Sequence, residues 1–522
     1  MNRGSRIPFA GGLSGLLAAL ALPPFHLWPL VFVALVPLAV ALGRPGHPAT
    51  RGDAVWAGLA YGAVFHLLLL HWVPLTVHGM TPAGALSGAL AVVILAGVGG
   101  IQGLALHRLL RRRAVSPIVA LPLVWGGAEL ALAWAGPLAV PWLPLGLALA
   151  AAPELAGPAE WVGPRGLTLW IAGVNGGVAA AYRATVGTHV REAVEGGRSG
   201  VRGRRLVPLL GGAVALVLLP AAWGLVRAER IPMEPLPSIL VGQMEIPREL
   251  LLDPERRDRV ADDALLAITE RFAGVAPAPA PAFVLLPEAP FASPWGPEIE
   301  RRVTSLASAV GAPVLAGAHR IGEDGGRRNA LLAVGPDGSV RTLHATRRLV
   351  PGVERPGLAS GPGGDVADVG GIDFGVLICF EAAFDPDARR MRRSGAELLL
   401  NPSNDGWFRP SGQGWLPAAA LAQHRAHLIL RAIETRTGAV RASVGGELLV
   451  VAPTGRVLVS RPPGGEGLVP VRPLTSRETT LFVRFGDAGV LAVLLILAGG
   501  AVVGASSRFV GNQSDEGFDE GE

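Results

Sequence analysis

The sequence predicts a multi-spanning α-helical membrane domain of about eight helices, joined to a large extracytoplasmic α/β domain. Three observations predict it: a high apolar content, a series of long apolar segments in the first 228 residues, and strands alternating with helices after residue 237. Half of the 522 residues are apolar and only 17% are charged. A soluble protein of this length needs more polar surface, because its exterior faces water.

Apolar segments of bilayer-spanning length place seven spans in residues 1–228 and one more at 486–506. The segments lie at 8–25, 28–43, 54–75, 85–107, 115–135, 166–182, 207–226 and 487–506. Residues 137–160 are also apolar, but Pro137, Pro141, Pro144 and Pro153 interrupt them. Such prolines favour a re-entrant or interfacial loop over a further span.

The arginines of the membrane part indicate its orientation. They gather at the N-terminus and after the second, fourth and sixth segments, whereas the loops around 26, 80 and 137–165 contain only Arg165. Positive loops stay cytoplasmic. We therefore expect a multi-pass protein of the cell (inner) membrane with both termini cytoplasmic and 229–485 on the extracytoplasmic, periplasmic side. The loops account for the basic balance, so no nucleic-acid partner is expected.

Residues 229–485 form the expected α/β domain, and an acidic tail at 507–522 follows the last span. Most strand candidates are continuous apolar segments, as buried strands of a layered structure should be. The strands are expected at 238–241, 283–286, 314–318, 330–334, 375–379, 398–401 and 439–443, and the helices at 254–273, 297–310, 387–394 and 417–437.

Two reactive side chains directly follow apolar strands. Glu288 follows one, and Cys379, the only cysteine, ends another. Catalytic groups of α/β sheets usually lie at such strand ends, and a carboxylate beside a thiol can serve as its general base. Singly, a strand-end Glu is more often solvated and a lone Cys is more often a small apolar residue. Together they predict a thiol nucleophile with its base.

No metal or other cofactor is expected. His424 and His427 lie three residues apart on one predicted helix, but no carboxylate or thiolate motif accompanies them at metal-ligand spacing.

Residues 237–480 resemble the nitrilase superfamily, which implies an α-β-β-α sandwich with a Glu-Lys-Cys triad. The resemblance is carried by Pro287-Glu288, Ile378-Cys379-Phe380-Glu381, Asn401-Pro402-Ser403-Asn404-Asp405-Gly406-Trp407-Phe408 and Arg431-Ala432-Ile433-Glu434. The flanking spans are similar to those of the apolipoprotein N-acyltransferase family. That branch is also indicated by Pro141-Trp142, Asn175, and Leu349-Val350-Pro351 followed by Glu354.

The resemblance implies a two-step acyl transfer. Glu288 takes the proton of Cys379, whose thiolate attacks an ester of a phospholipid and becomes a thioester. The amine of a diacylglyceryl-cysteine, at the N-terminus of an apolipoprotein acceptor, then takes the acyl group. Glu354 and Glu381 match site-supporting positions, although either can equally be a structural ion-pair partner.

The chain departs from the family pattern at the lysine of the triad. Thr346 stands at that position, all 46 basic residues are arginine, and Phe380 replaces a common tyrosine. Our hypothesis is that Arg348 partly replaces the lysine, because an extended segment would point it to the same face as Thr346. The alternative is that Arg347 and Arg348 are surface charges and turnover is weak or lost.

Two other functions stay open on the sequence. One is a membrane-tethered amidase or other carbon–nitrogen hydrolase, which would release a free acid. The other is a catalytically impaired paralogue that only binds lipid or lipoprotein, which the missing lysine favours.

Overall fold

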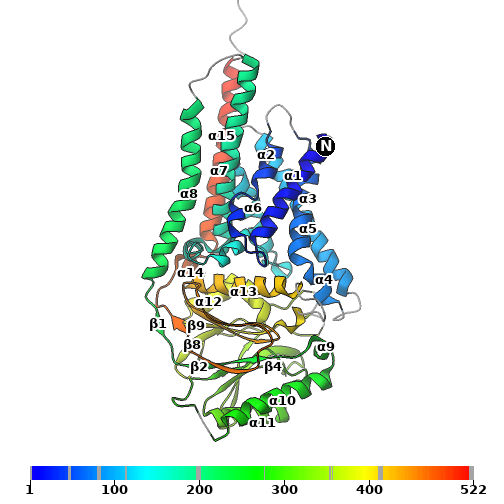
Figure 1. Cartoon of the computed structure of the whole chain (residues 1–522), viewed down its shortest axis with the longest axis vertical. Coiled ribbons are helices and arrows are strands. Elements are labelled where there is room, and N and C mark those ends of the chain that lie inside the picture. The colour runs from blue at the N-terminus through cyan, green and yellow to red at the C-terminus, as the bar shows by residue number, and fades with distance from the viewer. Residues whose placement is uncertain are drawn as a thin grey trace, which may run out of the picture.

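The computed structural model places a group of long helices at one end of the molecule and the α/β domain at the other (Figure 1). It describes residues 3–44, 49–78, 84–111, 115–195, 202–274, 277–351, 354, 357–408 and 416–515. Part of the expected acidic tail lies outside this range, and helix α15 (Ala488–Asp515) continues past its expected end at 506.

The N-terminal part is helical throughout. Its helices are α1 (Arg3–Ala21), α2 (Val36–Leu42), α3 (Arg51–Leu70), α4 (Trp72–Val77), α5 (Gly84–Arg111), α6 (Pro117–Ala133), α7 (Ala159–Glu195) and α8 (Arg202–Arg230). Among the described residues, α3 and α5 are long and apolar enough to cross a membrane by length and composition. Shorter apolar helices lie at Arg6–Ala21, Trp28–Leu42, Pro117–Ala133 and Ala488–Val502. The expected number of eight spans stays a prediction.

Two apolar segments form short helices instead of long ones. The expected span at 28–43 consists of a 3-10 helix, η1 (Trp28–Phe32), followed by the short α2. The proline-interrupted segment contains the 3-10 helices η2 (Gly136–Leu138) and η3 (Leu145–Ala151), and α7 begins only at Ala159. Proline removes a backbone donor, which explains why no α-helix forms there.

Glycines allow α3 and α5 to contact each other through their backbones. A Cβ atom built on Gly58 would lie 2.1 Å from the carbonyl oxygen of Gly99, and one on Gly62 would lie 2.3 Å from that of Ala96. Side chains at these positions would force the two helices apart. Close approach through small residues is how helices associate in a membrane, where no hydrophobic effect drives them together.

The α/β domain is built on one continuous sheet of twelve strands, ordered β6-β5-β4-β3-β2-β10-β9-β8-β7, with β13 on β2 and β11 and β12 beyond β10. Its strands are β2 (Ile239–Met244), β3 (Val284–Leu285), β4 (Val314–Ile321), β5 (Arg327–Val334), β6 (Val340–Ala345), β7 (Ala367–Val369), β8 (Ile372–Val376), β9 (Leu398–Asn404), β10 (Gly438–Val444), β11 (Leu448–Val451), β12 (Val457–Arg461) and β13 (Gly467–Val471). A separate pair joins β1 (Glu234–Pro235) to β14 (Leu474–Thr475).

The sheet folds into two halves that pack face to face. They join only where Ser443 and Val444 of β10 pair with Gln243 and Met244 of β2. Between the halves lies an apolar core from both, including Val241, Phe283, Leu285, Phe374, Leu400 and Val440. Successive side chains of a strand point to opposite faces, so Leu240 and Leu399 face outward into two other cores.

Helices cover both outer faces, which confirms the expected α-β-β-α sandwich. On one face lie α9 (Arg248–Leu251), α10 (Pro254–Phe272) and α11 (Pro297–Val310). On the other lie α12 (Asp385–Arg393) and α13 (Leu416–Thr435), and the helices of the N-terminal part pack beyond them (Figure 1). The helix expected at 297–310 has those bounds, whereas the strand expected at 375–379 ends at Val376.

The side chain of Gln423 on α13 joins the α/β domain to the helical part. Its carbonyl oxygen accepts from the indole N–H groups of Trp72 (3.2 Å) and Trp142 (2.8 Å), and its amide donates to the Leu69 carbonyl (2.9 Å). The buried Arg165 on α7 adds ion pairs with Asp385 and Asp487. The contacts of Gln423 hold α13 against the N-terminal helices, and the ion pair of Arg165 with Asp385 holds α12 against α7.

We predict that Gly99→Ala lowers the thermal stability of the protein in detergent, since its Cβ would meet the Gly58 carbonyl at 2.4 Å. Overpacking of this kind costs about 1–3 kcal/mol. Gly97→Ala on the same helix is the matched control, because nothing lies within 4 Å of its added Cβ. Equal unfolding midpoints for the two variants would contradict the close contact of α3 and α5.

Candidate active site

Cys379 lies at a sharp turn just after β8, at the start of the 3-10 helix η4 (Cys379–Ala383). Its φ angle is 46°, a left-handed conformation that is uncommon for residues other than glycine. Its carbonyl oxygen lies 3.0 Å from Nε2 of His424 and 3.4 Å from Nδ2 of Asn401. Such strain clusters at functional sites and persists only where surrounding contacts hold it.

The ring of His424 joins the carbonyl of Cys379 to a buried carboxylate. Nε2 lies 3.0 Å from the carbonyl oxygen of Cys379, and Nδ1 lies 2.9 Å from Oδ1 of Asp405. Burial opposes ionisation of Asp405, but His424, Arg441 and Ser403 hold its pKa below the usual range. Both ring nitrogens of His424 are therefore engaged with oxygens of the protein.

Arg441 of β10 holds the same assembly from behind. Its Nε donates to Oδ1 of Asn401 (2.7 Å), its Nη2 donates to the carbonyl of His424 (3.0 Å), and its Nη1 lies 3.9 Å from Asp405. All four side chains are buried. His424, Asp405, Asn401 and Arg441 therefore form one network, which we call the carbonyl clamp of Cys379.

Glu288 follows β3, whose carboxyl end lies on the same edge of the sheet as that of β8. Its Oε1 accepts from Nδ2 of Asn329 (2.5 Å) and its Oε2 accepts from the backbone N–H of Asn404 (2.7 Å). Arg257 of α10 donates to the next carbonyls, those of Ala289 and Pro290. The carboxylate is thus buried and fixed on both oxygens.

The carboxylate of Glu288 and the thiol of Cys379 interact electrostatically, since each group shifts the pKa of the other. Burial raises the pKa of Glu288 to about 7, although Asn329, Asn404 and the thiol lower it. Burial, with Glu288 and Asp405 nearby, raises the pKa of Cys379 well above its usual range. The sulfur is therefore a thiol that needs a base, and the base beside it titrates near neutrality.

Glu381 connects the turn of Cys379 to the loop after β6. Oε2 accepts from the backbone of Ile378 (2.9 Å) and pairs with Nε2 of His344 (2.8 Å), while Oε1 accepts from the backbone of Arg347 (2.8 Å). Burial opposes its ionisation, but the His344 charge and these hydrogen bonds hold its pKa below the usual range. Its contacts position both segments.

Thr346 and Glu354 follow β6 and lie near Glu288: the backbone N–H of Thr346 donates to the carbonyl of Asn329 (2.9 Å), and Glu354 interacts electrostatically with Glu288. Thr346 is only 3% exposed, and its hydroxyl has no hydrogen-bond partner among the described residues. The same holds for Oδ1 of Asn329 and of Asn404. Burial and the charge of Glu288 raise the pKa of Glu354 to about 8. Buried polar atoms without partners are rare. The oxygens of Thr346, Asn329 and Asn404 are therefore suited to bind polar atoms of a substrate.

Arg348 forms an ion pair with Asp387 and lies outside the group of residues that contact the thiol. Its Nε lies 3.0 Å from Oδ2 of Asp387, and its guanidinium carbon lies 4.9 Å from the ring centroid of Phe384. Strand β6 ends at Ala345, so the alternation expected of an extended segment does not reach Arg348. Arg347 binds the same carboxylate at 3.2 Å.

An apolar surface continues from the nucleophile to the membrane helices. The ring of Phe380 stacks on Trp142 at 5.7 Å and meets Phe384 edge-on at 5.1 Å. Trp72 and Leu70 of the helical part belong to the same cluster. The thiol is therefore adjacent to a surface that can hold an alkyl chain.

The sulfur of Cys379 could share a metal ion with Asp405 and His424 by distance alone, since one ligand atom from each lies within 4.8 Å of the others. A histidine ligand must be neutral and must offer a lone pair. Both nitrogens of His424 already lie within hydrogen-bonding distance of oxygens of the protein, so His424 acts as part of the clamp.

Comparison with known proteins gives two matches to families. Residues 14–177 match the apolipoprotein N-acyltransferase N-terminal domain, and residues 295–472 match the carbon-nitrogen hydrolase family. The second match confirms the expected class of the α/β domain.

Curated relatives match nearly the whole chain. An apolipoprotein N-acyltransferase of Gloeobacter violaceus is 30% identical over 562 residues, 95% of this chain and 96% of its own. One of Geobacter metallireducens is 28% identical over 525 residues, 94% of each chain. Among solved structures, a CN-hydrolase superfamily protein of Xanthomonas campestris is 21% identical, covers 50% of this chain and 97% of its own, and has a TM-score of 0.36.

We predict that His424→Gln slows formation of an acyl group on Cys379 about 10- to 100-fold, because a hydrogen bond to a charged group such as the Asp405 carboxylate contributes about 1.5–3 kcal/mol. The change should lower kcat more than it raises KM, since His424 contacts the nucleophile's backbone. His427→Gln is the matched control, because its ring contacts the carbonyl and the indole of Trp142 instead of the carbonyl of Cys379. Equal rates in the two folded variants would contradict the clamp.

Proposed function

Because the chain belongs to the apolipoprotein N-acyltransferase family, we propose that it is an acyltransferase that N-acylates lipoproteins. The acyl donor is a phospholipid and the acceptor is the amine of a diacylglyceryl-cysteine. The single observation that carries the chemistry is the buried Glu288 carboxylate beside the Cys379 thiol, where each group shifts the pKa of the other.

In the first step, Glu288 takes the proton of the thiol as the sulfur attacks the ester carbonyl of the phospholipid. A C–S bond forms, and the carbonyl oxygen becomes an oxyanion. The ester C–O bond then breaks, and the proton on Glu288 passes to the leaving oxygen, which gives a lysophospholipid. The acyl chain remains on Cys379 as a thioester, against the apolar surface of Phe380 and Trp142.

In the second step, the amine of the acceptor attacks the thioester. Glu288 accepts the amine proton and returns it to the sulfur as the C–S bond breaks, so that an amide and the free thiol result. The carbonyl clamp keeps the sulfur in one place through both steps. Burial of the site limits access of water, which would otherwise hydrolyse the thioester.

The expected orientation explains why such a domain is joined to apolar helices. We propose that eight spans hold the chain in the membrane, with both termini cytoplasmic and the α/β domain outside. Both substrates are then lipids of the leaflet next to the domain. The support is the distribution of arginine along the sequence and the docking of α13 on the helices through Gln423.

The two alternatives have less support. A carbon–nitrogen hydrolase would share the α/β domain, but the relatives that match the helices as well as the domain are named acyltransferases. An impaired paralogue would not need a buried, hydrogen-bonded base beside its thiol. In our proposal Glu354 and Glu381 support the site. Glu354 interacts electrostatically with Glu288, and Glu381 holds the turn that carries Cys379.

We predict that the purified protein, given phospholipid alone, gains one acyl mass that neutral hydroxylamine removes and that is absent in Cys379→Ala. Glu288→Gln should slow the gain about 10²- to 10⁴-fold, the usual effect of a general base. Since Glu288 must be ionised to act, the rate should rise with pH through about 7. Added diacylglyceryl peptide should take the label as an amide; release of free fatty acid instead would favour the hydrolase.

We also propose that Arg348 supplies part of the charge of the missing lysine. Asp387 already neutralises much of that charge, so Arg348→Ala should slow acylation only several-fold, less than the roughly 10²- to 10³-fold typical of a full oxyanion donor. Arg347→Ala is the control, because it shares the carboxylate but does not lie on Phe384. Thr346→Lys should accelerate acylation. An unchanged rate in Arg348→Ala would remove Arg348 from the mechanism.

A further inference from the structure

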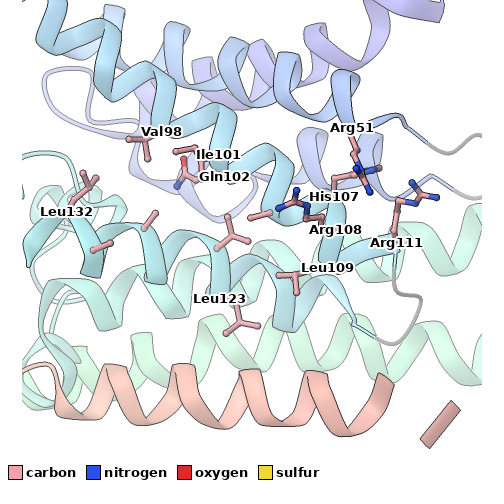
Figure 2. A pocket seen from close by; sticks show the side chains of 14 residues that line it. Arg51, Val98, Ile101, Gln102, His107, Arg108, Leu109, Arg111, Leu123 and Leu132 are labelled. Atoms are coloured by element: carbon pink, nitrogen blue, oxygen red, sulfur yellow. The ribbon is translucent and has the colours of Figure 1, made fainter. Parts of the chain in front are cut away.

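A groove of about 1000 Å³ runs between α5 and α6, with Arg51 of α3 at one end. Figure 2 shows Arg51, His107, Arg108 and Arg111 gathered at that end, and Val98, Ile101 and Leu132 at the other. The groove is lined by three arginines and no acidic residue. Its two ends therefore differ sharply in chemistry.

The basic end of the groove contains side-chain nitrogen atoms that form no hydrogen bond within the described chain. His107 is only 1% exposed, yet neither ring nitrogen has a hydrogen-bond partner among the described residues. The nearby carboxylate of Asp53 is occupied by the backbone N–H (2.9 Å) and hydroxyl (2.8 Å) of Thr50. A buried donor without a partner is costly, so a ligand with anionic oxygens would stabilise this end.

The apolar end has the length and exposure suited to an alkyl chain. Ile101 is 71% exposed although it lines the groove. The helix rises roughly 20 Å along α5 from Val98 to Arg111. One leaflet contributes about 15 Å of hydrocarbon, so the groove spans one leaflet with its charged end at the interface.

We propose that this groove binds one anionic phospholipid, with its phosphate at Arg108, Arg111 and His107 and an acyl chain along Ile101 and Leu123. A zwitterionic lipid would leave the three arginines only partly neutralised. The basic end of α5 lies far from the α/β domain (Figure 1). With the proposed orientation the lipid comes from the cytoplasmic leaflet and is distinct from the acyl donor.

Native mass spectrometry of the full chain tests this with phosphatidylglycerol and phosphatidylcholine as probes. Wild type should retain one phosphatidylglycerol in preference to phosphatidylcholine. The double variant R108Q/R111Q should bind it about 30-fold more weakly, the ratio for about 1 kcal/mol per arginine at a membrane surface. I101W, which fills the apolar end, should also lose the lipid, while the exposed control R6Q should keep it.

Equal retention of both lipids, or unchanged retention in R108Q/R111Q, would overturn the proposal. Displacement by inorganic phosphate together with normal binding in I101W would assign the arginines to a free anion and would overturn it as well. The measurement reads binding without turnover, so it can fail while the acyl-transfer proposal stands.

Discussion

The hydrogen bonds to the carbonyl oxygen of Cys379 connect parts of the chain that lie far apart in sequence. His424 comes from α13, and Asn401 comes from β9. A left-handed conformation costs about 1–3 kcal/mol outside glycine, and these donors hold it in place. Since α13 also carries Gln423 into the helical part, the helix that holds the nucleophile also holds the N-terminal helices against the α/β domain. The position of the sulfur and the position of these helices are therefore set together.

The layers of the α/β domain were predictable because buried strands consist mainly of apolar residues, which the sequence shows directly. Strand β3 and the first three residues of β9 are buried and form continuous apolar segments in the sequence. The outer strand β6, with three partly or fully exposed residues followed by three buried ones, has no such pattern and was missed. The second apolar segment was expected to span, but it is short and broken by proline, and α2 has only seven residues.

The site was only half visible in the sequence. Glu288 and Cys379 could be found because each follows a strand. Asn329 and Arg441 could not, because a polar residue inside a strand gives no sign of whether it faces a site or solvent. His424 attracted attention only through its spacing to His427, and its true partners are 19 and 45 residues away along the chain. The orientation of Arg348 depended on an extended segment that the structure does not contain.

The hydroxyl of Thr346, in place of an amine, has a consequence for the fate of the acyl group. A thioester is an electrophile that amines attack readily, and no side chain of this protein carries an amine, because all 46 basic residues are arginine. Guanidinium groups stay protonated and do not compete. A thioester on Cys379 therefore has no side-chain amine of this protein to react with, so self-acylation of a lysine does not compete with transfer to the acceptor.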